Sequence, residues 1–189
     1  MHKEQSIRII GGKYRSRVLC WPSNIDIRPT KDKIKEAIYS SLYNVNDFTI
    51  LDLFAGSGGF ALEGLSRGAK KVYLNDISST SIQCINKNVD ILNCKNNVFI
   101  SQLLDFDALK FYYEKNIKFD VIFIDPPYKY NQYKQLLDNI NEYDLLNINA
   151  TIIIEHNHDF DYDENVFEIV KEKRYGEINI SFIKKRKNK

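Results

Sequence analysis

The sequence predicts an α/β protein built on a doubly wound, mostly parallel sheet of seven strands. Short apolar runs, typical of buried strands, alternate along the chain with segments whose apolar residues recur at helical spacing. A glycine-rich turn, residues 56–59, joins the first of these runs to the helical segment that follows it. Such alternation favours parallel strands with helices on both faces, and it places ligands at the carboxyl ends of the strands.

Five parallel strands are expected, over residues 49–54, 71–75, 98–100, 119–124 and 150–154. Helices are expected at Ile34, Ala37, Ile38 and Leu42, at Phe60, Leu62 and Leu65, at Ile82, Ile85, Val89 and Leu92, within 104–115, and at Tyr133, Leu136, Leu137 and Ile140. Thr30 is placed to cap the first helix and Gly68 to end the second. Near the carboxyl terminus, Ile178, Ile180 and Phe182 alternate with other residues, which predicts an antiparallel pair with residues 165–172.

Residues 7–20 stand outside this alternation. Gly11 and Gly12 separate two β-like runs, which predicts an N-terminal β-hairpin extension. We therefore divide the chain into a basic N-terminal arm, residues 1–28, and a main domain, residues 29–189.

The charge of the chain is concentrated at its two ends. The net charge is +2, but residues 1–35 carry +6, residues 184–189 carry +5, and the remainder carries −9. An acidic body with basic ends indicates a polyanion that is contacted by the ends rather than by the whole surface. The alternative for the C-terminal run is a frayed, solubilising tail, and for the arm it is a charged surface hairpin.

Composition excludes several classes of protein. Cys20, Cys84 and Cys94 are odd in number and lack a Cys-x-x-Cys spacing, so neither a disulfide framework nor a metal site is expected. No apolar run approaches the ~20 residues that span a membrane, and the N-terminus lacks a signal-peptide core. We expect a cytoplasmic protein with a reduced interior and no membrane association.

The sequence Asp125-Pro126-Pro127-Tyr128 follows the strand expected at residues 119–124. Each proline fixes φ and lacks an N–H, so the turn cannot be helical and its carbonyl oxygens stay free to accept hydrogen bonds. Acceptors and a flat ring at the end of a strand suit the exocyclic amine of a nucleobase, because the acceptors bind the amine hydrogens while Tyr128 stacks on the base. The alternative is a Pro-Pro turn that only ends a strand.

Residues 52–59, Asp-Leu-Phe-Ala-Gly-Ser-Gly-Gly, are the second informative segment. Glycines at a strand-to-helix turn allow a ligand to approach the backbone and the N-terminus of the helix. Gly56, Gly58 and Ala61 also satisfy the dinucleotide pattern, so a nicotinamide cofactor is the alternative. Asp52 favours S-adenosylmethionine, because a carboxylate repels a pyrophosphate but attracts the cationic methionine end of that cofactor.

Asp76 follows the second expected strand and lies 20 residues beyond Gly56. In a sheet of this class, an acid at that place bonds ribose hydroxyls. The alternative role is a charge that stabilises the N-terminus of the next helix.

Together these motifs resemble Rossmann-like, S-adenosylmethionine-dependent methyltransferases, and in particular the RsmD-type family of bacterial 16S ribosomal RNA guanine-N2 methyltransferases. The resemblance runs the whole length of the chain. Residues 8–19 resemble the N-terminal signature of the family, and residues 28–39 resemble its Arg-Pro-Thr helix. Residues 52–59 and 125–128 match its cofactor and catalytic motifs, and Tyr175-Gly176 matches a late one.

The resemblance implies roles for three sets of residues. They are catalytic Asp125, Pro126 and Tyr128; cofactor-binding Asp52, Phe54, Gly56, Gly58, Asp76, Ile77, Gln102 and Leu103; and RNA-binding Arg8, Lys13, Arg15, Arg17 and Arg28. The chain departs from the family at Gln102-Leu103, where Asp-Ala is common, and Asp105 is a candidate for the missing acid. Ser16 replaces a glycine that is common in the arm.

The implied reaction is methyl transfer from S-adenosylmethionine to the N2 amine of a guanine in small-subunit ribosomal RNA or an assembling 30S particle. Chemistry on a base requires that base to leave its stack. Glu155 is expected to be a structural or pocket-wall acid, and we expect a monomer because no surplus apolar stripe suggests an interface. The rival functions are an adenine-N6 methyltransferase of DNA or RNA and a catalytically silent RNA-binding subunit.

Overall fold

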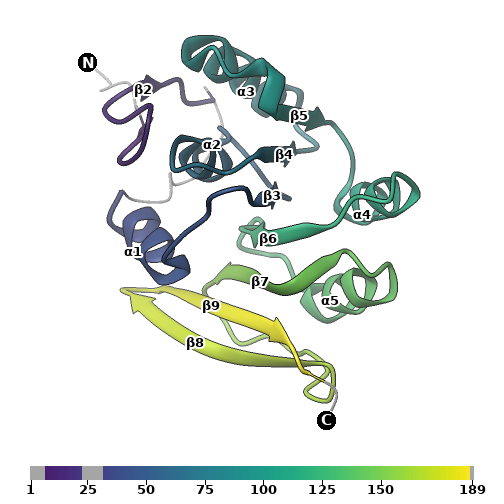
Figure 1. Cartoon of the computed structure of the whole chain (residues 1–189). Coiled ribbons are helices and arrows are strands. Elements are labelled where there is room, and N and C mark those ends of the chain that lie inside the picture. Colours follow the sequence, from purple (N-terminus) through teal and green to yellow (C-terminus); the bar gives the residue numbers. More distant parts are fainter. Residues whose placement is uncertain (1–6, 23–31, 188–189) are drawn as a thin grey trace.

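The structure is a computed structural model that describes residues 7–22 and 32–187. Its core is a seven-stranded sheet in the order β5-β4-β3-β6-β7-β9-β8 (Figure 1). The strands are β3 (Thr49–Asp52), β4 (Lys71–Asn75), β5 (Val98–Ser101), β6 (Phe119–Ile124), β7 (Leu146–His156), β8 (Phe167–Tyr175) and β9 (Ile178–Lys185). The first five are parallel, whereas β9 runs antiparallel to β7 and β8. The chain moves from β3 outward to β5 and returns on the other side of β3, which confirms the predicted doubly wound, Rossmann-like fold.

Helices cover both faces of this sheet (Figure 1). They are α1 (Asp32–Leu42), α2 (Gly59–Ser66), α3 (Ser79–Leu92), α4 (Asp105–Glu114) and α5 (Tyr133–Glu142), with a short 3₁₀ turn, η1 (Lys95–Asn97), before β5. Successive residues of a strand point to opposite faces. Ile50 and Val121 therefore pack in one apolar cluster with residues of α1, α2 and α3, while Leu51 and Ile122 pack in a second cluster with residues of α4 and α5.

The expected strands and helices are present, although β7 is longer than expected. β7 begins at Leu146 rather than at residue 150. Its first residues lack the pattern of a buried strand, because Ile148 is 93% exposed, Asn149 has a φ of 64°, and the pairing with β6 is irregular there. Thr30, the expected cap of α1, lies outside the described residues.

The expected N-terminal hairpin is confirmed, although its strands are short. β1 (Ile7–Arg8) and β2 (Val18–Leu19) pair antiparallel over two residues each. The side chains of Ile7, Ile9 and Leu19 are buried in the same cluster as α1, α2 and α3. The hairpin is therefore packed onto the helical layer of the main domain.

Candidate active site

Two loops that the sequence analysis singled out meet at one edge of the sheet. β3 pairs in parallel with β6, and Asp52 lies opposite Phe123 in the register, so the loops after the two strands are neighbours. Both loops line a pocket of about 640 Å³, to which β4 and β7 also contribute residues. Asp52 and Asp125 therefore line the same pocket.

The glycine-rich turn takes its shape from two residues with positive φ. Gly56 has a φ of 56° and lines the pocket, and its N–H donates to Oδ2 of Asp76 at 2.8 Å. Gly58 has a φ of 77°, and a Cβ atom there would lie 2.5 Å from Cδ2 of Leu74. Gly56 is therefore a residue of the pocket wall, whereas Gly58 lies behind it and lets α2 begin close to β4.

Asp52 is buried at the end of β3, with 2% of its surface exposed. Its Oδ2 atom accepts a long hydrogen bond of 3.4 Å from the N–H of Ala61, and its Oδ1 atom has no partner among the described residues. Burial raises the pKa of Asp52 to about 8, against the effect of the Ala61 hydrogen bond, and the charge of Asp76 raises it further. The open oxygen fits a cationic ligand, because a cation stabilises the buried carboxylate.

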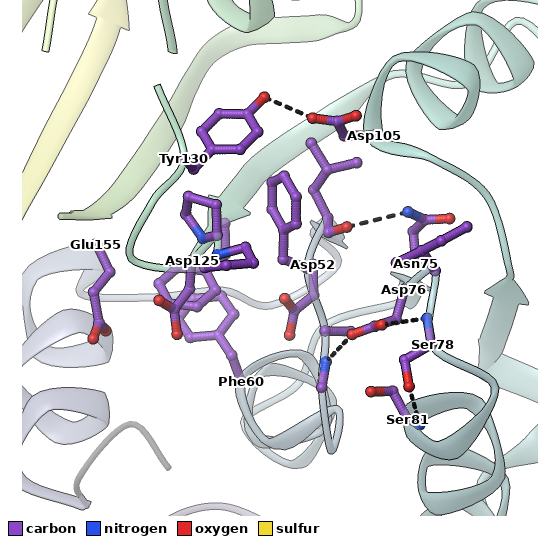
Figure 2. A pocket seen from close by; sticks show the side chains of 18 of the residues that line it. Asp52, Phe60, Asn75, Asp76, Ser78, Ser81, Asp105, Asp125, Tyr130 and Glu155 are labelled. Carbon is purple, nitrogen blue, oxygen red and sulfur yellow. Dashed lines mark hydrogen bonds between the residues drawn. The ribbon is translucent and has the colours of Figure 1, made fainter. Parts of the chain in front are cut away.

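Asp76 is held by two backbone N–H groups (Figure 2). Its Oδ2 atom accepts from Gly56 and its Oδ1 atom from Ser78, both at 2.8 Å. Ser78 in turn caps α3 by accepting a hydrogen bond from the N–H of Ser81. Each carboxylate oxygen keeps a further lone pair, so Asp76 can also accept hydrogen bonds from ribose hydroxyls.

The wall of the pocket that is formed by the loops after β4 and β5 is partly apolar. Ile77, which is 58% exposed, and Leu103 line the pocket. Gln102 lies outside the lining, and its Nε2 atom donates to the carbonyl of Ile77 at 3.2 Å. Asp105 lines the pocket and accepts a hydrogen bond of 2.6 Å from the hydroxyl of Tyr130. The acid at this end of the pocket is therefore Asp105, while Gln102 supports the backbone of Ile77.

The loop after β6 supplies the polar groups of the opposite wall. Burial raises the pKa of Asp125 well above its usual range, and the charges of Glu155 and Asp52 raise it further. Pro126 is buried, whereas Tyr128 is 56% exposed and lines the pocket. This loop therefore presents a carboxyl group inside the pocket and an aromatic ring at its rim.

Some pocket residues were not anticipated from the sequence. Asn75 ends β4, and its Nδ2 atom donates to the carbonyls of Leu53 at 3.2 Å and Leu103 at 3.0 Å, which ties together the loops after β3 and β5 (Figure 2). Tyr130 packs edge-on against Phe54, with ring centroids 5.4 Å apart. The role of Asn75 could have been predicted, because it is a polar residue at the end of an apolar run. The position of Tyr130 could not, because this residue reaches the pocket only through the path of the Pro-Pro turn.

The N-terminal hairpin is anchored on α2 by one buried carboxylate. Glu63 accepts hydrogen bonds of 2.8 Å from the backbone N–H groups of residues 10–11, and one of 2.7 Å from Nε of Arg67. Nζ of the buried Lys35 lies 3.9 Å from Glu63 and donates to the carbonyl of Arg8 at 2.7 Å. We call Glu63, Lys35 and Arg67 the hairpin junction.

Basic side chains project from the anchored hairpin. Lys13, Arg15 and Arg17 are exposed. Arg8 is exposed as well, and its Nε atom donates to Asp32 at 2.7 Å. Arg28, the fifth predicted RNA contact, lies outside the described residues. The hairpin therefore offers solvent-accessible positive charge on a fixed backbone.

Other features of the described segments, 7–22 and 32–187, bear on the kind of site. Within them, no group of three His, Cys, Asp or Glu side chains is arranged to hold a metal ion. Cys20, Cys84 and Cys94 are free thiols. No helix in these segments is long and apolar enough to cross a membrane.

One family model and several known proteins resemble this chain over most of its length. The model, described as conserved hypothetical protein 95, matches residues 7–184. Ribosomal RNA small subunit methyltransferase D of Haemophilus influenzae is 34% identical over 152 residues, which are 79% of this chain and 78% of that protein. YlbH of Bacillus subtilis, provisionally described as an rRNA methyltransferase, is 33% identical over 183 residues, which are 95% of this chain and 100% of that protein. The solved structure of yhhF from Escherichia coli, provisionally described as a methyltransferase, has a TM-score of 0.85 at 27% identity and covers 98% of this chain and 100% of its own.

Proposed function

This chain belongs to the conserved hypothetical protein 95 family of RsmD-type methyltransferases, and from that membership we propose that it methylates the N2 amine of a guanine in small-subunit ribosomal RNA. Its general activity is S-adenosylmethionine-dependent methylation of ribosomal RNA. One observation supports the proposal: the buried carboxyl group of Asp52, with an oxygen open to a cation, shares a pocket with the Asp-Pro-Pro-Tyr loop after β6.

The pocket residues fit S-adenosylmethionine. The unpartnered Oδ1 atom of Asp52 would accept from the ammonium group of the methionine moiety, and Asp76 would accept from the ribose hydroxyls. When bound, the cofactor supplies an electrophilic methyl carbon on its sulfonium. The other residues assigned to the cofactor divide into two groups. Phe54, Gly56, Ile77 and Leu103 line the pocket and would surround the adenine, whereas Gly58 and Gln102 lie behind its wall and support the backbone of the loops.

The loop after β6 would hold the target base. The lone pair of a guanine N2 amine is delocalised into the ring, so catalysis consists mainly of positioning. Asp125 and the carbonyl of Pro126 accept hydrogen bonding from the amine, which directs the lone pair toward the part of the pocket lined by Asp52. Tyr128 stacks on the base after it has left the RNA stack. Transfer of the methyl group would leave the cofactor as a neutral thioether and the amine as a cation, and Asp125 would then accept a proton from that amine.

The basic arm, residues 1–28, would position the RNA on the methyltransferase domain, residues 29–189. We assign phosphate contacts to Arg8, Lys13, Arg15, Arg17 and Arg28. Exposed side chains on a hairpin whose backbone is anchored by Glu63 support this role for the hairpin residues. We further propose that the protein acts as a monomer, in the cytoplasm, on ribosomal RNA or the assembling 30S particle. Light scattering on the purified protein tests the oligomeric state.

Mass spectrometry and primer extension of ribosomal RNA from cells that lack this gene test the proposed function. We expect one N2-methylguanosine of the small-subunit RNA to disappear. It should return when small subunits from these cells are incubated with S-adenosylmethionine and the wild-type protein, but not with the Asp125→Ala protein. Unchanged RNA methylation in the deletion strain would overturn the proposal, and the loss of an N6-methyladenosine instead would favour the adenine-N6 alternative.

A further inference from the structure

Glu155 lies beside Asp125 and has no part in the mechanism above. β6 and β7 are parallel neighbours in which Ile124 lies opposite Ile154, so Asp125 and Glu155 occupy the next level of the sheet side by side. Ile124 and Ile154 pack with α4 and α5, so alternation turns the next two side chains toward the opposite face. Figure 2 shows the carboxyl groups of Asp52, Asp125 and Glu155 in a row, on neighbouring strand ends.

The carboxyl group of Glu155 is short of hydrogen-bond donors. It lines the pocket, and its Oε2 atom is buried with no partner among the described residues. Burial raises the pKa of Glu155 to about 7. A buried acceptor without a donor is unfavourable, so a ligand that brings N–H groups to this oxygen is favoured.

The order of the three carboxyl groups along the strand ends indicates which part of the target base Glu155 would contact. Asp52, on β3, is assigned to the cofactor, and Asp125, on the central strand end, is assigned to the amine that receives the methyl group. Glu155 lies on the far side of Asp125 from Asp52, because β7 lies beyond β6 in the sheet. A base whose amine meets Asp125 would therefore place the atoms next to that amine against Glu155.

Guanine is the base whose amine has a donor as its neighbour on the Watson–Crick edge. Its N1 atom carries a hydrogen beside the C2 amine, whereas N1 of adenine, beside the C6 amine, is an acceptor. In its ionised form Glu155 only accepts hydrogen bonds, and two parallel N–H groups that match its two oxygens favour that form over the protonated one. Adenine in the same place would bring the lone pair of its N1 atom close to the lone pairs of the Glu155 carboxylate, and the two would repel each other.

We propose that Glu155 accepts hydrogen bonds from N1–H and one N2–H of the target guanine, and thereby selects guanine over bases whose N1 is an acceptor. Asp125 and the carbonyl of Pro126 then accept the second N2–H. This inference rests on the proposed function and names the residue that reads the identity of the base.

A test compares two purines that share the C2 amine. Small-subunit ribosomal RNA is prepared with either guanosine or 2-aminopurine riboside at the methylated position, and is assembled with ribosomal proteins into particles. In 2-aminopurine, N1 is an acceptor. We expect the wild-type protein to methylate guanosine with a kcat/KM about 100-fold or more above that for 2-aminopurine, because a site built for a hydrogen bond rejects an analogue that lacks it.

Glu155→Gln should change this preference. Its amide can donate to N1 of 2-aminopurine while its oxygen accepts from the amine. We expect kcat/KM for guanosine to fall roughly 100-fold and the preference to shrink to about tenfold or less. Glu155→Asp keeps an acceptor-only carboxylate and should retain the preference for guanosine at a lower rate.

Two controls separate recognition from folding. Glu142→Gln makes the same chemical change at an exposed residue of α5 and should leave both rates unchanged. Calorimetry with S-adenosylhomocysteine and a denaturant unfolding curve should show that the Glu155 variants are folded and bind the product of the cofactor normally.

A wild-type preference for guanosine in the Glu155→Gln protein would overturn this inference, and so would a loss of affinity for S-adenosylhomocysteine in that protein, because Glu155 would then belong to the cofactor end of the pocket. Either result leaves the proposed function standing as long as N2-methylguanosine forms. The proposed function itself fails if the wild-type protein forms none.

Discussion

Asp52 in the pocket and Glu63 at the hairpin junction are both buried carboxyl groups, but they differ in the number of hydrogen-bond donors that reach them. Glu63 is 0% exposed and accepts from two backbone N–H groups and from Arg67, with Lys35 nearby. Asp52 is 2% exposed, with one long hydrogen bond and an oxygen that has no partner among the described residues. Burial alone therefore does not distinguish a structural acid from a binding acid. The number of donors that reach the carboxylate does so.

The same contrast holds for the regions around the two residues. At the pocket, burial raises the pKa of the carboxyl groups of Asp52, Asp125 and Glu155, and the charges of neighbouring acids raise those of Asp52 and Asp125 further. At the hairpin junction, Lys35 and Arg67 neutralise the carboxylate of Glu63. The basic side chains that project from the hairpin, Lys13, Arg15 and Arg17, are exposed to solvent. We therefore expect substitutions in the pocket to affect ligands and chemistry, and substitutions at the junction to affect stability.

The largest expected effect is that of Asp125→Ala on turnover. Removal of this carboxyl group, which accepts from the amine and takes its proton, should lower kcat on small-subunit particles by about 1,000-fold or more, at the strong end of what one positioned acid or base contributes. Affinity for S-adenosylhomocysteine, measured by calorimetry, should stay close to that of the wild type. Asp90→Ala, at an exposed residue of α3, is the matched control. Near-wild-type turnover of the Asp125→Ala protein would remove this residue from the mechanism.

Asp52→Asn should separate binding from stability. The neutral amide cannot pair with a cation as a charged group, so affinity for S-adenosylmethionine should fall by about 100-fold, as expected for the loss of a buried charged pair. The free energy of unfolding without ligand should stay within about 1 kcal/mol of the wild type or rise, because no charge remains to be buried. Calorimetry and urea unfolding measure the two quantities. Lower stability with unchanged affinity would reverse the assigned roles of Asp52 and Glu63.

Glu63→Gln should have the opposite effect. It removes the buried carboxylate partner of Lys35, whose other partner, Asp32 at 3.8 Å, is partly exposed, and this should lower the free energy of unfolding by about 3 kcal/mol. Glu36→Gln is the control, because Glu36 pairs with the same Arg67 at 2.7 Å but at the surface, and its loss should cost about 0.5 kcal/mol or less. Equal losses in the two variants in urea unfolding would contradict the distinction between a saturated buried acid and a surface acid.

Simultaneous replacement of Lys13, Arg15 and Arg17 by alanine should weaken RNA binding without affecting the cofactor. Each lost phosphate contact should reduce the slope of log K against log salt by up to about 0.9 in the duplex limit. A filter-binding titration over a range of salt concentrations measures the slope. Replacement of Lys87, Lys95 and Lys110, exposed lysines elsewhere, removes the same charge and should leave the slope nearly unchanged. Equal slopes for the two triple variants would exclude the hairpin from the RNA interface.

The smallest expected effect is the pH dependence of stability without ligand. The folded-state pKa values of Asp52, about 8, and Glu155, about 7, lie above the values of 3.8 and 4.5 for free side chains. The folded state therefore binds more protons than the unfolded state in this window, and stability falls as pH rises. The lowered pKa of His156 acts with the opposite sign, but below its ordinary value of 6.5. Urea unfolding between pH 6.5 and 8.5 should show the decline, and Asp52→Asn should reduce it.

Some features of the fold were predictable because they are local. The sequence placed the parallel strands and their helices where the structure has them, since each carries its own apolar period. β7 was predicted too short because Asn147, Ile148 and Asn149 do not have a buried-strand pattern, and they join the sheet only through pairing with β6. Glu63 was not identified at all, because a helix position gives no sign that a hairpin will cover it.

The order of residues along the chain is sufficient to specify the doubly wound fold and the chemical groups at its strand ends, because periodicity and turn residues act over short distances. Packing in three dimensions then selects which of these groups face one another. It sets Glu155 beside Asp125, brings Asp105 into the pocket and leaves Gln102 and Gly58 behind its wall. It also supplies Glu63 with donors and leaves an oxygen of Asp52 open. Strand pairing joins segments distant in the chain, and no local pattern records which buried oxygen will meet a donor.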